Sequence, residues 1–136
     1  MKSWFVLAAV AVAIPVAAAA AFDKDMPTIE AVMQKLHKGK AKSQFAVLKA
    51  QADAKPPAWE AIQKSTKDFV ILGAALEKND PPKGEKASWK KLADKYFQDS
   101  KAMDDAATAK DLTAFQAAHK TLGGSCMACH NAHRGK

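Results

Sequence analysis

Two cysteines and two of the four histidines lie close together near the end of the chain, in the sequence GGSCMACHNAHRGK. Cys126 and Cys129 are the only cysteines, and His130 follows Cys129 directly. This CxxCH spacing is the attachment pattern of a haem c. Two thiols three positions apart lie on one helical turn, so each can bond a vinyl group on the same porphyrin edge. His130 can then be the proximal iron ligand, and we expect one covalently bound haem c.

Other interpretations of this motif remain open. A thioredoxin-like CxxC needs a βαβ context and a helix N-terminus that lowers the thiol pKa, whereas the sequence before this motif is helical throughout. A zinc site would take Cys126, Cys129, His130 and His133, but four ligands so close in sequence would struggle to close a tetrahedron. A CxxC disulfide closes too small a loop to stabilise much. Chance occurrence is the last alternative, and we favour haem attachment.

The first residues, MKSWFVLAAVAVAIPVAAAAAFDKD, have the layout of a secretory signal peptide. A positive Lys2 precedes an apolar run that Pro15 breaks, and an alanine tract leads to a cleavage site near Ala21. A retained anchor is the alternative, but the run before Pro15 is short for a span of about 20 residues. We therefore expect a signal peptide at 1–21 and one domain at 22–136. The mature protein would lie in the periplasm or another exported compartment, without stable membrane insertion.

Basic residues exceed acidic ones, 21 to 14, which gives a formal net charge of +7. The lysines are scattered along the chain and interleaved with acids, as in KKLADKYFQDSK. This pattern is typical of solvated helix faces and gives no indication of nucleic-acid binding. It predicts at most electrostatic steering of an acidic partner.

The elements that must position the motif are helical, since no alternating strand pattern or hairpin turn occurs. Pro-Pro pairs at 56–57 and 81–82 cut the chain, and Thr108 and Asp111 form a capping-box arrangement before the last segment. Gly39 interrupts the first segment and predicts a bend or a thin wall there. Four segments have apolar residues at helical spacing: about 27–50, 58–77, 88–107 and 112–133. Short joints between them predict an all-α, antiparallel up-down four-helix bundle.

A helical bundle with one CxxCH in its last helix, followed by a basic residue, resembles the class II c-type cytochromes. These are the cytochrome c-prime group and its low-spin relatives. The resemblance covers the mature chain in architecture, but only Cys126 to Arg134 in motif. It implies that the haem is attached to the C-terminal helix and that the first helix supplies the residue facing the distal side of the iron. Low-spin members have a methionine there, and high-spin members have a bulky apolar residue.

The matching stretch, TIEAVMQKLHKGK, offers Met33, Leu36 and His37. Met33 and His37 are four residues apart and so share a helix face. We favour Met33 as the distal ligand, with His37 as the alternative and an open site under Leu36 as the third. The arginine that high-spin members often carry one turn earlier is absent, because Ile29 stands there. The resemblance thus favours the low-spin, methionine-ligated branch.

The predicted function is single-electron transfer between redox partners, through a low-spin iron. No acid–base constellation is visible, so we do not expect an enzyme. The expected partners are redox proteins with acidic docking surfaces, and the resemblance also allows a homodimer. Arg134 is a candidate contact to a haem propionate, or is simply solvated, and His119 is expected to pack inside the bundle. The alternative function is a five-coordinate haem that binds nitric oxide or carbon monoxide as a sensor, carrier or scavenger.

Overall fold

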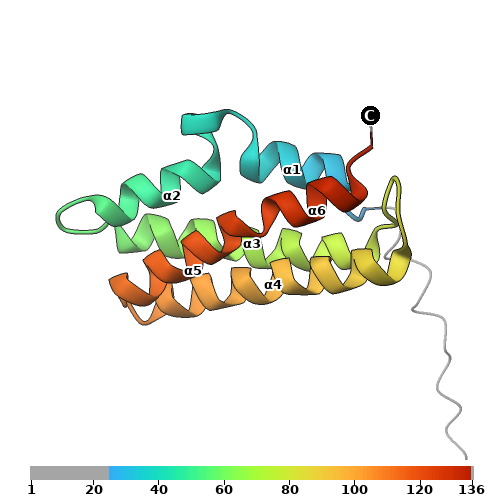
Figure 1. Ribbon diagram of the computed structural model, residues 1–136. Coiled ribbons are helices and arrows are strands. Elements are labelled where there is room, and N and C mark those ends of the chain that lie inside the picture. Colours follow the sequence, from blue (N-terminus) through green and yellow to red (C-terminus); the bar gives the residue numbers. More distant parts are fainter. Residues whose placement is uncertain (1–24, 136) are drawn as a thin grey trace, which may run out of the picture.

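The computed structural model describes residues 25–135, and this part of the chain contains helices and loops but no strand. The prediction of an all-helical fold is confirmed for these residues. The signal peptide predicted at 1–21 lies outside them. The described elements, shown in Figure 1, are α1 (Ile29–His37), a 3₁₀ turn η1 (Lys40–Lys42), α2 (Gln44–Asp53), α3 (Trp59–Lys78), α4 (Lys86–Thr108), α5 (Leu112–Gly124) and α6 (Cys126–His133).

The first predicted segment is two helices rather than one bent helix. Gly39 has a φ of 106°, a left-handed conformation that ends the helical run after α1. Ser43 then begins α2 as its N-cap, and its hydroxyl accepts a hydrogen bond from the backbone nitrogen of Ala46 at 3.1 Å. The bend expected at Gly39 is therefore a complete break, and a continuous helix over 27–50 was wrong.

The longest helices, α3 and α4, pack along each other and contain much of the core. At one end, the indole nitrogen of Trp89 donates to the carbonyl of Leu76 at 3.0 Å. At the other end, the Gln63 amide donates to the carbonyl of Ala107 at 2.9 Å. The beginning of α4 thus lies against the end of α3, and the end of α4 against the beginning of α3. Between them lie buried apolar residues that include Ile62, Phe69, Leu76, Trp89, Ala93 and Met103.

The last predicted segment is divided at Ser125, which separates α5 from α6. Asp111 caps α5 and accepts from the backbone nitrogen of Ala114 at 3.0 Å. Thr108, expected to take part in that cap, instead lies in the last turn of α4 and bonds the carbonyl of Asp104. Along this last segment Phe115, His119, Leu122 and His133 are buried, whereas Leu112, Cys126 and Cys129 are partly buried.

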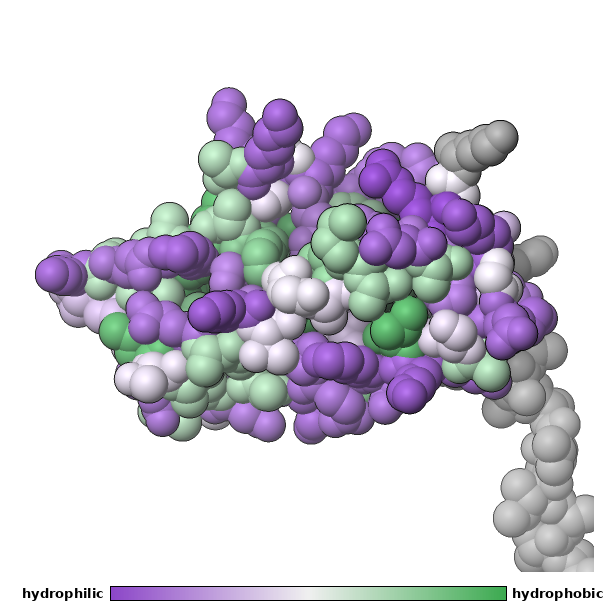
Figure 2. Space-filling view, viewed as in Figure 1, coloured by the Kyte–Doolittle hydropathy of each residue, from purple (hydrophilic) through white to green (hydrophobic). Residues whose placement is uncertain are grey.

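Four helices flank the α3–α4 pair. Helices α1 and α2 contact each other and α3, whereas α5 and α6 contact each other and α4. Helix α2 lies alongside α3 and also contacts α5 (Figure 1). Hydrophilic residues are spread widely over the face drawn in Figure 2, with hydrophobic residues between them. Within 25–135, no helix has the length and apolar character needed to cross a membrane.

Candidate functional site

The two thiols lie on α6, one helical turn apart, and both are free and half-buried. Cys129 packs against the hydrophobic core, and the Sγ of Cys126 lies 3.8 Å from the carbonyl oxygen of Leu122. Burial raises the pKa of both thiols, and for Cys129 the neighbouring Cys126 raises it further. Both side chains are therefore uncharged thiols near neutral pH, set against the interior. His130 follows on the exposed side of the helix.

Helix α6 is held in place by His133, which is 2 % exposed. Its Nδ1 donates to the carbonyl oxygen of Lys83 at 2.9 Å, and its Nε2 lies 3.1 Å from the hydroxyl of Ser88. The ring also meets Trp89 edge-on, with centroids 5.5 Å apart. One imidazole therefore joins the end of α6 to the loop before α4 and to the first turns of α4. The position of the thiol-bearing helix depends on it.

His37, the alternative distal ligand, is partly buried at the end of α1. Its Nε2 lies 2.8 Å from the hydroxyl of Tyr96 on α4, and its ring is surrounded by those of Phe45, Phe69 and Tyr96, with centroids 5.4 to 6.0 Å away. Burial lowers the pKa of His37 to about 4, and the charges of His130 and His119 lower it further. His37 is thus neutral at pH 7 and lies within electrostatic range of His130.

The other candidates from the sequence have different surroundings. Met33 is partly buried and packs against the hydrophobic core. Leu36 is fully buried in that core. Arg134 is exposed at the end of α6, where its backbone nitrogen donates to the carbonyl of His130 at 3.0 Å.

Tyr96 on α4 also belongs to this region. It is 8 % exposed, and burial raises the pKa of its hydroxyl, with a further contribution from Cys126. Its hydroxyl thus lies near both the thiol of α6 and the imidazole of α1. The contact between Tyr96 and His37 joins residues 59 positions apart, so no local pattern could have indicated it.

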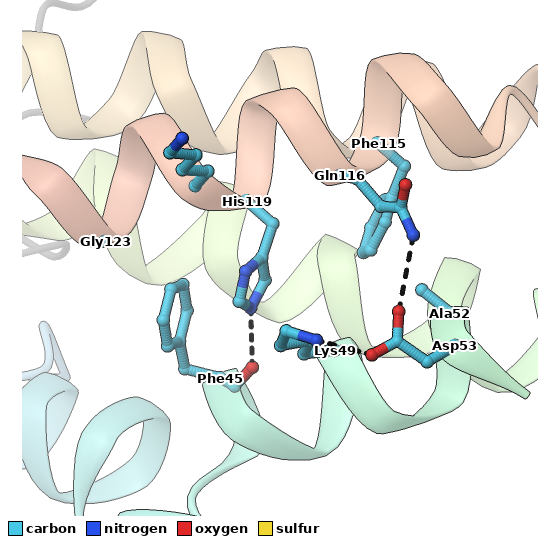
Figure 3. Close-up of a pocket in the computed structure, with 9 residues that line it drawn as sticks. Phe45, Lys49, Ala52, Asp53, Phe115, Gln116, His119 and Gly123 are labelled. Carbon is cyan, nitrogen blue, oxygen red and sulfur yellow. Dashed lines mark hydrogen bonds and ion pairs between the residues drawn. The ribbon is translucent and has the colours of Figure 1, made fainter.

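A cavity of about 370 Å³ lies beyond this region, between α2 and α5 (Figure 3). His119 points from α5 toward α2, donates from Nε2 to the carbonyl of Phe45 at 2.7 Å, and stacks on the Phe45 ring at a centroid distance of 3.9 Å. Phe45 also lies close to His37. Phe45 therefore both lines the cavity and neighbours His37, and the packing role predicted for His119 is confirmed.

Two observations concern the alternative interpretations of CxxCH. Between residues 25 and 135, no group of three or more His, Cys, Asp or Glu side chains is arranged to hold a metal ion. A reactive CxxC needs a lowered thiol pKa, whereas the pKa of both thiols is raised.

The donor groups fit a haem c. Cys126 and Cys129 offer two neutral thiols on neighbouring positions of one helix face, and His130 offers an adjacent imidazole. A second, neutral imidazole, that of His37, comes from a different helix and lies within electrostatic range of His130. Two thiols and one or two imidazoles are the protein groups that a covalently attached haem requires.

Comparison with known proteins gives one match. Residues 84–134 match the family model described as Cytochrome C'. The matched part, less than half of the chain, runs from the loop before α4 through the CxxCH motif, and both Met33 and His37 lie outside it. No curated protein and no solved structure matches the chain. The match supports a class II c-type cytochrome, and hence a haem-binding protein with covalently attached haem c.

Proposed function

We propose that this protein is an exported monohaem cytochrome that carries single electrons between redox partners. Cys126 and Cys129 would form the thioether bonds, and His130 would be the proximal ligand. The helices would form an antiparallel up-down bundle that supports the haem on its last helix. The opposed ends of α3 and α4, joined by hydrogen bonds at each end, support this arrangement.

We further propose His37 as the distal ligand, in place of Met33, which the sequence favoured. This choice is supported by the surroundings of the His37 imidazole, which is partly buried, enclosed by three aromatic rings and lowered in pKa by burial and in part by the charge of His130. Met33 is partly buried and packs against the core, as Cys129 of α6 also does, so the two candidates must be separated by experiment. Two imidazole ligands would lower the reduction potential relative to a methionine–histidine pair.

The haem, when bound, supplies an iron that alternates between ferrous and ferric states. The chain's own residues hold and shield it. His133 keeps α6 against the loop before α4, and Phe45, Phe69 and Tyr96 enclose the imidazole of His37 and limit its contact with water. No bond of a substrate is made or broken in this account, so the protein is a carrier and not an enzyme.

The partner we propose is a redox protein with an acidic surface. The five residues after His37 include three exposed lysines, Lys38, Lys40 and Lys42, where the chain turns between α1 and α2. Exposed charges of one sign steer an oppositely charged partner toward a site and act mainly on the association rate. An encounter at this turn would bring the partner close to His37. Raising the salt concentration should therefore slow electron transfer to an acidic partner.

Optical spectra of the mature haem protein test the distal ligand. The wild-type ferric protein should be low-spin. His37→Phe, which keeps an aromatic ring among Phe45, Phe69 and Tyr96, should make it high-spin. Met33→Leu, the matched control on the same helix, should leave it low-spin. If Met33→Leu gives the high-spin spectrum and His37→Phe does not, the distal ligand is Met33.

The same spectra distinguish the second candidate function. A five-coordinate haem that binds nitric oxide or carbon monoxide would give a high-spin wild-type spectrum, unchanged by either substitution. That result would contradict the electron-carrier proposal.

A further inference from the structure

The hydroxyl of Tyr96 and the imidazole of His37 form a contact within the molecule's interior. Tyr96 is 8 % exposed, and its Oη lies 2.8 Å from Nε2 of His37. The Tyr96 ring packs closely against the backbone of Gly73 on α3, where an added Cβ would lie 3.3 Å from its Cδ1. The hydroxyl therefore bonds the last residue of α1 while its ring packs on α3.

An imidazole nitrogen can have only one bonding partner at a time, either a hydrogen-bonding group or a metal. Nε2 can exchange a hydrogen bond with a hydroxyl, or it can coordinate a metal with the same lone pair, but not both. If His37 coordinates the iron through Nε2, the Tyr96 hydroxyl loses the partner it has in this structure. A buried hydroxyl without a partner is destabilising, so the hydrogen bond and the coordinate bond oppose each other.

We propose that Tyr96 competes with the haem iron for Nε2 of His37, so that the sixth position of the iron can open to a small neutral ligand such as carbon monoxide while Tyr96 holds the imidazole. This inference rests on the proposed ligation by His37. The closed state, with His37 on the iron, and the open state, which accepts the gas, are then two states of one site. The fraction of open molecules is set by one hydrogen bond between α1 and α4.

The test is a carbon monoxide titration of the ferrous haem protein, comparing wild type with Tyr96→Phe. Removing the hydroxyl takes away the partner of the released imidazole and favours the closed state. The apparent dissociation constant rises in proportion as the open fraction falls. We expect it to increase by about three- to tenfold, the effect of one ordinary hydrogen bond.

The matched control is Ser100→Ala, which removes another buried hydroxyl from α4. Ser100 bonds only the carbonyl of Tyr96 within its own helix, so carbon monoxide affinity should stay at the wild-type value. An affinity in Tyr96→Phe that is unchanged or tighter than wild type would overturn the proposal. Equal losses in both variants would also overturn it, because the effect would then come from general loosening of α4.

A second measurement avoids dependence on how well Tyr96→Phe folds. In the wild-type ferrous carbon monoxide complex, the ¹⁵N resonance of His37 Nε2 should report a hydrogen bond. If His37 instead shows no hydrogen bond in that complex, competition by Tyr96 is excluded. Failure of the proposed ligation is separately visible, because His37→Phe would then leave the resting ferric spectrum the same as that of the wild type, whatever Tyr96→Phe does.

Discussion

Nδ1 of His133 lies 2.9 Å from the carbonyl oxygen of Lys83, and this hydrogen bond attaches the helix with the two thiols to the loop before α4. The same ring bonds the Ser88 hydroxyl and meets the edge of Trp89. His133 is buried, on the inner side of α6. Its partners show that it fixes where the CxxCH motif stands relative to the rest of the fold.

Replacing His133 with alanine should destabilise the protein by about 2–4 kcal/mol, because two buried hydrogen bonds and an aromatic contact are lost together. Denaturant unfolding measures this. Asn131→Ala, at an exposed position of the same helix, should change the free energy of unfolding by about 0.5 kcal/mol or less. Equal effects of the two substitutions would mean that His133 does not anchor α6.

The loop on the other side of this contact depends on Gly84. Its φ is 82°, and an added Cβ would lie 2.8 Å from the backbone oxygen of Ala132 and 2.8 Å from Nδ1 of His133. Gly84→Ala should therefore lower the free energy of unfolding by about 2 kcal/mol or more. Gly124→Ala is the control: Gly124 is helical, and nothing lies within 4 Å of its added Cβ. That variant should be as stable as wild type or up to about 1 kcal/mol more stable. A stable Gly84→Ala protein would contradict the close packing between this loop and α6.

Stability should fall in mildly acidic solution, in part because of His119. Burial lowers the pKa of His119 from its ordinary value of 6.5. Below about pH 6.5 the unfolded chain takes up a proton that the folded protein does not, so the unfolding free energy decreases until the folded pKa is reached. His119→Gln keeps an N–H that can donate to the Phe45 carbonyl but cannot titrate. The unfolding free energy of the wild type minus that of His119→Gln should be constant above about pH 7 and should decrease as the pH falls. Parallel curves down to about pH 5 would rule out this linkage.

Much of the fold follows from helical spacing and local signals. The apolar spacing predicts the ends of α3 (59–78) and α4 (86–108) to within about two residues, because Pro-Pro pairs separate the segments. The first segment was harder. Its apolar stripe stops after Leu36 and resumes only at Phe45, which predicted a bend. The left-handed φ of Gly39, together with the Ser43 cap, makes it a break. Asp111 competes with Thr108 for the α5 cap and wins because Thr108 still belongs to α4.

The candidate site also has one part that the sequence predicts and one part that depends on tertiary contacts. Cys126, Cys129 and His130 can be recognised from spacing alone, because the attachment chemistry needs thiols one turn apart beside an imidazole. The distal side depends on tertiary contacts between α1 and α4. Met33 and His37 share a helix face, and the family resemblance alone favoured Met33. The partners of His37 come from α2, α3 and α4, and they become neighbours only when the helices pack.

The most direct test of the account is the mass of the denatured protein, produced together with the machinery that attaches haem c. A covalent haem survives denaturation, so the mass should be that of the mature chain plus one haem. Cys126→Ala combined with Cys129→Ala should remove this added mass completely. A wild-type mass equal to the chain alone, or lower by the two hydrogens of a disulfide between Cys126 and Cys129, would contradict haem attachment and with it the proposed electron carrier.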